Sequence, residues 1–100
     1  NNNHYVGMLG AKGIALPCTA EDRFLPTAKQ ILEHITTARL ICLNSPLNPT
    51  GTALDAEVLT DICKAIVAEN QRREAAGERA LYLMYDHIYW MLCMEGVRHV

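Results

Sequence analysis

Residues 39–52 read RLICLNSPLNPTGT, an apolar run followed at once by a loop rich in proline and glycine. The run 39–43 shows no alternation of apolar and polar residues, which favours a strand covered on both faces. Asn44–Thr52 contains two prolines and a glycine, and this composition predicts a loop. Strands with this pattern are typical of parallel sheets. The neighbouring elements then indicate the fold class.

The clearest element follows directly, at Asp55–Ala75. Its apolar residues recur at helical spacing and form one stripe, with charged residues mostly outside it: Val58, Leu59, Ile62, Cys63, Ile66 and Val67. Asp55 is the predicted N-cap, and Gly77 follows the predicted end. Ala80–Tyr85 is again a short apolar run, and it predicts a strand that ends at Asp86.

Two further elements are predicted upstream. A helix at about Pro26–Thr36 places proline in the first helical position, and its apolar residues recur at helical spacing: Ala28, Ile31, Leu32 and Ile35. Gly13–Pro17 is a short apolar run between glycine and proline, which predicts a strand. The order is then strand, helix, strand, helix, strand. This βαβαβ pattern predicts an α/β fold with a parallel sheet and right-handed crossovers.

The composition excludes several function classes. Half of the 100 residues are apolar and 20% are charged, with a formal net charge of −2. A nucleic-acid partner would require a basic patch, which this balance does not favour. No apolar run approaches the roughly 20 residues that span a bilayer, and the first residues carry no secretory signal. We therefore expect neither a nucleic-acid nor a membrane partner.

The cysteines indicate a reducing compartment. None of the four has the C-x-x-C spacing of a zinc or redox site, so no metal is expected. Cys42 lies in a predicted strand and Cys63 on the apolar stripe, which favours buried, reduced thiols and a cytoplasmic location. The mixed charges of Gln71–Glu74, with Glu78 and Arg79, are typical of a solvated helix end.

Polar residues follow two of the predicted strands, where open parallel sheets bind ligands. Asn48-Pro49-Thr50-Gly51 also fits an ordinary type I turn, and Asp86 also fits a turn or an N-cap. Tyr89, taken alone, fits a half-buried packing residue. A spacing of three places Asp86 and Tyr89 on one side of a turn or short helix. Each motif alone is weak, but their positions at the carboxyl ends of strands favour a site.

Three strings together resemble those of class I/II aminotransferases, which are fold-type I enzymes that use pyridoxal 5′-phosphate (PLP). The strings are NNNHY at residues 1–5, NSPLNPTGT at 44–52 and YDHIYW at 85–90. They occur in the family's order and cover nearly the whole chain. The resemblance implies that residues 1–100 are part of the PLP-binding large domain, with no internal boundary.

The resemblance also implies roles for four residues that bind the cofactor. Asp86 matches the aspartate that keeps the pyridine nitrogen protonated, so that the ring draws electrons from a substrate carbanion. Tyr89 and Asn48 match the residues that hydrogen-bond the ring's phenolic oxygen, which lowers the proton affinity of the Schiff-base nitrogen. His4 matches a histidine that orients the aspartate. The Asn48–Pro49 peptide bond is expected to be cis, as in relatives.

The implied reaction is amino-group transfer between an amino acid and a 2-oxo acid, by a homodimer. Two alternatives remain open: another fold-type I PLP enzyme (lyase, decarboxylase or synthase), or the aminotransferase-like sensor domain of a GntR-type transcription regulator. An unrelated βαβ domain is a third. The three lysines do not match the family's Schiff-base lysine. We therefore expect an internal segment of a longer enzyme, with no catalytic residue of its own, inactive alone.

Overall fold

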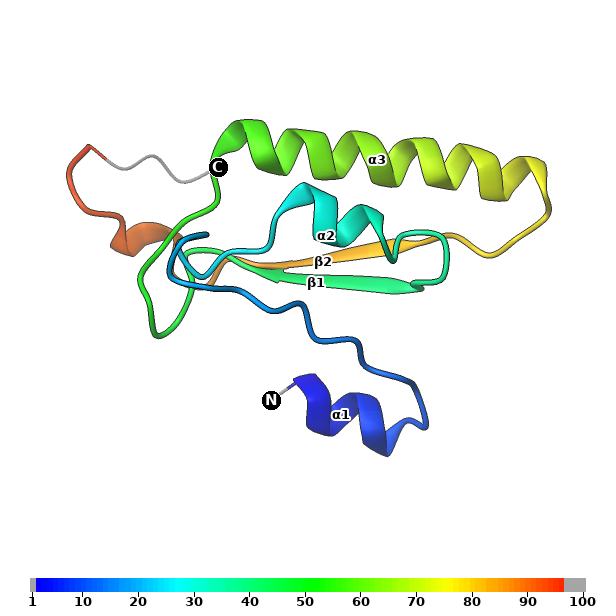
Figure 1. The fold of residues 1–100 in the computed structure, drawn as a ribbon, viewed down its shortest axis with the longest axis horizontal. Coiled ribbons are helices and arrows are strands. Elements are labelled where there is room, and N and C mark those ends of the chain that lie inside the picture. Colours follow the sequence, from blue (N-terminus) through cyan, green and yellow to red (C-terminus); the bar gives the residue numbers. More distant parts are fainter. Residues whose placement is uncertain (1, 97–100) are drawn as a thin grey trace.

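The computed structural model describes residues 2–96, which form a two-stranded parallel sheet and four helical elements. In chain order the elements are α1 (Asn2–Met8), α2 (Ala28–Leu32), β1 (Leu40–Asn44), α3 (Ala56–Ala75), β2 (Tyr82–Asp86) and the 3₁₀ helix η1 (Trp90–Leu92). Figure 1 shows α2 and α3 stacked over one face of the sheet, while α1 lies apart on the other side. The α/β segment with a parallel sheet that the sequence predicts is therefore present.

The sheet is built from one unit of strand, helix and strand. β1 and β2 pair in register from Leu40 opposite Tyr82 to Asn44 opposite Asp86. Parallel neighbours cannot be joined by a hairpin, and α3 provides the long crossover between them. Because both strands run the same way, the loops after them leave the sheet at one edge.

The core lies between the sheet and its two covering helices. Its buried members come from the strands, the helices and the segments beside them: Leu25, Ile31, Ile35, Leu43, Leu54, Ile62, Ile66 and Leu81. Side chains alternate along a strand, so the opposite face presents Leu40, Cys42, Tyr82 and Met84, all exposed. For the described residues, the prediction of a strand covered on both faces is therefore wrong, and so is the predicted burial of Cys42.

The predicted strand at Gly13–Pro17 does not form. Within residues 2–96 the sheet contains β1 and β2 alone, and the segment runs as irregular chain with Ile14 49% exposed. Its carbonyl at Pro17 accepts a 2.6 Å hydrogen bond from the Gln30 side chain, which ties it to α2 rather than to a strand. A short apolar run is compatible with several structures, and among the described residues no neighbouring strand offers a partner.

α2 is shorter than the predicted helix, and its start differs. Thr27 is the N-cap and forms a capping box with Gln30, so Pro26 lies outside the helix. The Thr27 hydroxyl accepts from the Gln30 backbone N–H at 3.3 Å, and the Thr27 N–H donates to the Gln30 side chain at 2.9 Å. The T-x-x-Q spacing signals this start. After Leu32 the chain continues as turns instead of helix.

α3 matches its predicted bounds closely. Asp55 is its N-cap residue, and Gly77, with φ of +69°, follows its end in the left-handed conformation that glycine favours. The Asp55 side chain makes no capping hydrogen bond and instead pairs with Arg23 at 2.5 Å. Cys63 and Val67 of the predicted stripe are exposed, so the predicted burial of Cys63 is also wrong.

The charged end of α3 is exposed except for Arg73, which is buried together with Glu69. Arg73 is 3% exposed and Glu69 is 7% exposed, and the Arg73 Nε donates to the Glu69 carboxylate at 2.7 Å. The Arg73 guanidinium also reaches the carbonyl oxygens of Ile35 and Ala38, both at 2.9 Å. The prediction of a solvated helix end is confirmed for the other residues of the run, which are exposed. It is wrong for Arg73, which is buried because it binds carbonyl oxygens of the turns after α2.

Asn70 fixes the beginning of β2. Its side-chain amide donates to the Leu81 carbonyl at 3.0 Å, and its side-chain oxygen accepts from the Leu81 N–H at 2.8 Å. The Asn70 side chain thus satisfies both the N–H and the carbonyl of the buried Leu81, as a neighbouring strand would. Asn70 and Arg73 together anchor the amino ends of the strands to α3.

Candidate functional site

The site is built where β1 and β2 end together. Asn44 and Asp86 are the last paired residues, and the Ser45 N–H continues the ladder to the Asp86 carbonyl at 3.0 Å. Ser45 is 1% exposed, and its hydroxyl accepts a 2.9 Å hydrogen bond from the Leu54 N–H. The loop after β1 is therefore fixed at both of its ends.

The loop itself is tight and closed by backbone hydrogen bonds. The Leu47 N–H donates to the Thr52 carbonyl at 2.8 Å, and the Gly51 N–H donates to the Leu47 carbonyl at 2.7 Å. Gly51 has φ of +71°, where glycine is the residue of least strain. The predicted cis peptide bond at Asn48–Pro49 is confirmed, and Ser45–Pro46 is cis as well.

Asn48 and Tyr89, predicted to share one ligand atom, lie side by side. The Asn48 side-chain amide donates to the Tyr89 hydroxyl oxygen at 3.2 Å, although 41 residues separate them. A primary amide has a second N–H, and a hydroxyl that accepts still has its own proton to donate. Each residue therefore keeps a donor for a third oxygen placed between them.

Asn44 joins the two strand-end loops, a role that no sequence motif assigns to it. Its side-chain amide donates to the Asp86 carbonyl at 3.0 Å, and its side-chain oxygen accepts from the Asn48 N–H at 3.3 Å. The sequence gives one indication of this role: Asn44 is the polar residue at which the apolar run ends and the loop begins. The sequence does not reveal the register that sets Asn44 opposite Asp86.

An open hollow of about 290 Å³ lies against this pair. It is lined by Pro46, Leu47, Asn48, Pro49, Gly51, Tyr89 and Leu92. Ligand sites commonly combine apolar walls with few directed polar groups, and this lining has that composition. The Asn48 amide and the Tyr89 hydroxyl are the directed polar side-chain groups of this lining.

Asp86 lies at the same edge with an exposed side chain. Its carboxylate accepts a long hydrogen bond from the Ile88 N–H, at 3.4 Å, which is the pattern of a turn. The Trp90 N–H closes the next turn on the His87 carbonyl at 3.0 Å. These turns keep Tyr89 at the edge of the sheet where Asp86 ends β2.

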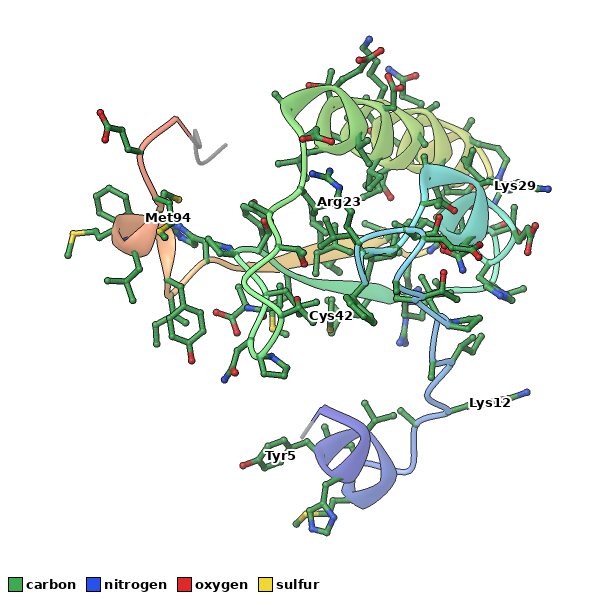
Figure 2. The ribbon with its side chains drawn as sticks, turned by 60° about the vertical axis from the view of Figure 1, so that its left-hand side comes forward. Tyr5, Lys12, Arg23, Lys29, Cys42 and Met94 are labelled. Atoms are coloured by element: carbon green, nitrogen blue, oxygen red, sulfur yellow. The ribbon has the colours of Figure 1, made fainter. Side chains whose placement is uncertain are left out.

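His4 is not brought to this edge. It lies in α1, where its ring contacts Tyr5 edge-on at 6.4 Å, and Figure 2 shows Tyr5 and α1 well away from the sheet. Asn1, the first residue of the NNNHY string, is outside the described residues. The predicted contact of His4 with Asp86 stays a prediction.

The lysines also lie elsewhere. Lys12 follows α1, Lys29 belongs to α2 and Lys64 belongs to α3. Figure 2 shows Lys12 and Lys29 on the opposite side of the molecule from Met94, which comes after η1. Among residues 2–96 no three histidine, cysteine or acidic side chains gather as a metal site. No helix in this part of the chain is long and apolar enough to cross a membrane.

The four cysteines are free thiols. Although Cys42 is exposed, partial removal of water by its neighbours raises the pKa of its thiol above the ordinary value. Burial also raises the pKa of the Cys18 thiol, and the nearby Asp22 carboxylate adds to this effect. A raised pKa lowers the fraction of reactive thiolate, so neither cysteine has the environment of a nucleophile.

Comparison with known proteins identifies the family. The profile of aminotransferase class I and II matches residues 1–95. An aspartate aminotransferase of Musicola paradisiaca is 36% identical over 93% of this chain, and one of Pyrococcus horikoshii is 33% identical over 89%. A valine–pyruvate aminotransferase of Mycobacterium tuberculosis is 32% identical over 88%.

The chain spans about a fifth of each relative, with 20% of the sequence covered in all three. No solved structure matches it significantly. The family profile covers both strand-end motifs, including the pair formed by Asn48 and Tyr89. The chain belongs to the class I and II aminotransferase family.

Proposed function

We propose that this chain supplies the pyridine-ring contacts of a PLP-dependent aminotransferase. The observation that carries the proposal is the 3.2 Å contact between the Asn48 amide and the Tyr89 hydroxyl, made across two strand ends. Each side chain keeps one donor, and Asp86 offers a carboxylate at the same edge. These groups match two atoms of the PLP ring: Asn48 and Tyr89 match the phenolic oxygen, and Asp86 matches the pyridine nitrogen.

Each residue does one physical task in this proposal. Asn48 and Tyr89 donate hydrogen bonds to the ring's phenolic oxygen and so stabilise its negative charge. The Asp86 carboxylate holds a proton on the pyridine nitrogen by placing a negative charge beside it. PLP, when bound, acts as the electron sink that stabilises a substrate carbanion. Pro46, Leu47 and Leu92 provide apolar surface beside the ring.

The reaction class rests on the relatives. The three relatives are aminotransferases for aspartate or for valine and pyruvate. Their substrates differ, so we propose amino transfer between an amino acid and a 2-oxo acid without assigning either. We further propose a cytoplasmic homodimer whose Schiff-base lysine lies outside residues 1–100. An isolated chain of these 100 residues is then inactive.

Asp86→Ala in the full-length protein tests the proposal. We expect turnover to fall by roughly 100-fold or more, because the pyridine nitrogen loses its negative partner. The melting temperature should change little, because Asp86 is exposed and its side chain makes one long hydrogen bond. The assay follows both products, a new amino acid and a new 2-oxo acid, in equal amounts.

Asp61→Ala is the matched control. Asp61 is an exposed aspartate of α3 that pairs loosely with Lys64 at 3.9 Å, so its loss should leave turnover unchanged. Near-normal turnover of Asp86→Ala would refute the assigned role. Release of ammonia or carbon dioxide without a new amino acid would instead indicate a lyase or a decarboxylase.

A further inference from the structure

Four residues close a ring of contacts at the carboxyl end of the sheet. The Asn44 side-chain amide donates to the Asp86 carbonyl at 3.0 Å, and the chain then turns from Asp86 to Tyr89. The Asn48 side-chain amide donates to the Tyr89 hydroxyl at 3.2 Å. The Asn48 backbone N–H closes the ring by donating to the Asn44 side-chain oxygen at 3.3 Å. Asn44 is the member of this ring whose side chain bonds to the backbone of both loops, and like Asp86 it does not line the hollow.

We propose that Asn44 is a positioning residue, which holds Asn48 against Tyr89 by clamping the loop after β1 to the last carbonyl of β2. The inference rests on the proposed function, since it assigns to Asn44 control over the donors for the ring oxygen. The Asp86 carbonyl already accepts from the Ser45 N–H at 3.0 Å. The bond from Asn44 is therefore additional to the strand ladder.

Both ends of the Asn44 side chain are needed for this task. The side-chain N–H fixes the position of Asn44 relative to the end of β2. The side-chain oxygen fixes the position of the Asn48 backbone relative to Asn44. A carbonyl oxygen has two lone pairs, so Asp86 can accept from both donors at once. An alanine at position 44 would leave the Asn48 N–H with water, and the Asn48 amide would lose its fixed distance to Tyr89.

The readout is the absorbance of bound PLP as a function of pH in the full-length protein. Donors at the phenolic oxygen lower the proton affinity of the cofactor, so misplacing them raises the midpoint of the titration. We expect Asn44→Ala to raise this midpoint by about half a pH unit, the size that corresponds to partial weakening of one hydrogen bond. In an Asn48→Ala background the same substitution should add no shift.

Asn70→Ala is the matched control. Asn70 also makes two side-chain hydrogen bonds to backbone, but at the opposite end of β2. Its loss should lower the melting temperature without moving the titration midpoint. Asn44→Asp serves if Asn44→Ala fails to fold, because it keeps the acceptor for Asn48 and loses the donor to Asp86. It should also raise the midpoint.

The outcomes separate the two claims. A wild-type protein that binds no PLP would overturn the proposed function. A normal wild-type titration with an unmoved midpoint in Asn44→Ala would overturn only the role of Asn44. An equal shift in Asn70→Ala, or a shift that persists in the Asn48→Ala background, would likewise reduce Asn44 to a general stabilising residue.

Discussion

Tyr89 has one hydroxyl, and its removal tests the most specific contact of the site. Tyr89→Phe keeps the ring and the apolar wall but deletes the proton that the proposal assigns to the cofactor's phenolic oxygen. We expect the midpoint of the PLP absorbance titration to rise by about 0.5 to 1 pH unit, with a smaller loss of turnover than in Asp86→Ala.

Tyr82→Phe is the comparison for this change. Tyr82 is 64% exposed on the uncovered face of the sheet, so its hydroxyl should be irrelevant to the titration. An unshifted midpoint in Tyr89→Phe would mean that Tyr89 does not donate to the ring oxygen. The 3.2 Å bond from Asn48 would then serve only to join the two loops.

At the scale of single residues, local sequence patterns identify the polar groups at a strand end but not the groups that lie across from them. Asn48, Asp86 and Tyr89 stand out because their motifs come directly after apolar runs, and their roles are implied by the resemblance to aminotransferases. The structure brings Asn48 and Tyr89 into contact, and the roles of all three residues stay predictions. Asn44 is missed because its role depends on the register between β1 and β2, which no local pattern encodes.

The element that carries the fold is α3, and Ile62 is its most buried residue, at 1% exposed. Ile62→Ala should destabilise the protein by about 2–5 kcal/mol, because it removes apolar contacts and leaves a cavity under the helix. Urea unfolding followed by circular dichroism measures this loss of free energy.

Val67→Ala is the matched change on the same predicted stripe. Val67 is 56% exposed, so its substitution should cost at most about 0.5 kcal/mol. Equal losses for the two variants would mean that α3 packs with a different face. The sequence could not predict that Ile62 is buried and Val67 exposed. An apolar stripe shows which face of a helix is turned to the core, but not how much of that face the core covers.

Elements with strong periodicity are predicted well, and short ones are not. α3, β1 and β2 lie within two residues of their predicted bounds, because long stripes and strand-ending polar residues are unambiguous. Gly13–Pro17 fits the same apolar description as β1 but has no partner strand among the described residues. Strand formation is a property of a pair, so a single run cannot decide it.

At the scale of the whole molecule, one buried arginine joins parts that are distant in sequence. Arg73 donates to carbonyls at Ile35 and Ala38, before β1, and to the Arg79 carbonyl at 3.2 Å, before β2. A buried cation needs a compensating anion, and Glu69 provides it one helical turn earlier. The sequence signal is the continuation of the apolar stripe: Ile62, Ile66, Glu69 and Arg73 follow at spacings of four, three and four.

Because Glu69 is paired in this way, the free energy of unfolding is expected to depend on pH in the acid range. Hydrogen bonds from Arg72 and Arg73 lower the pKa of Glu69 to about 2, from an ordinary value of 4.5. A hydrogen bond from Arg72 also lowers the pKa of Glu78. A carboxylate with a depressed pKa binds protons more weakly in the folded state, so acid favours unfolding. Its stabilising effect is complete above about pH 4.5 and is lost as the pH falls towards 2.

Glu69→Gln should therefore change the shape of the acid limb. We expect a lower melting temperature than wild type at pH 7, because Arg73 loses its buried anion, and a weaker dependence on pH between 4.5 and 2. Glu33→Gln is the control: Glu33 is exposed at the end of α2 and has no ion pair within residues 2–96. Thermal scans at fixed ionic strength across this range measure both effects. Parallel acid limbs in wild type and Glu69→Gln would mean that Glu69 is not the group that titrates, and that Arg73 is held by the carbonyl oxygens alone.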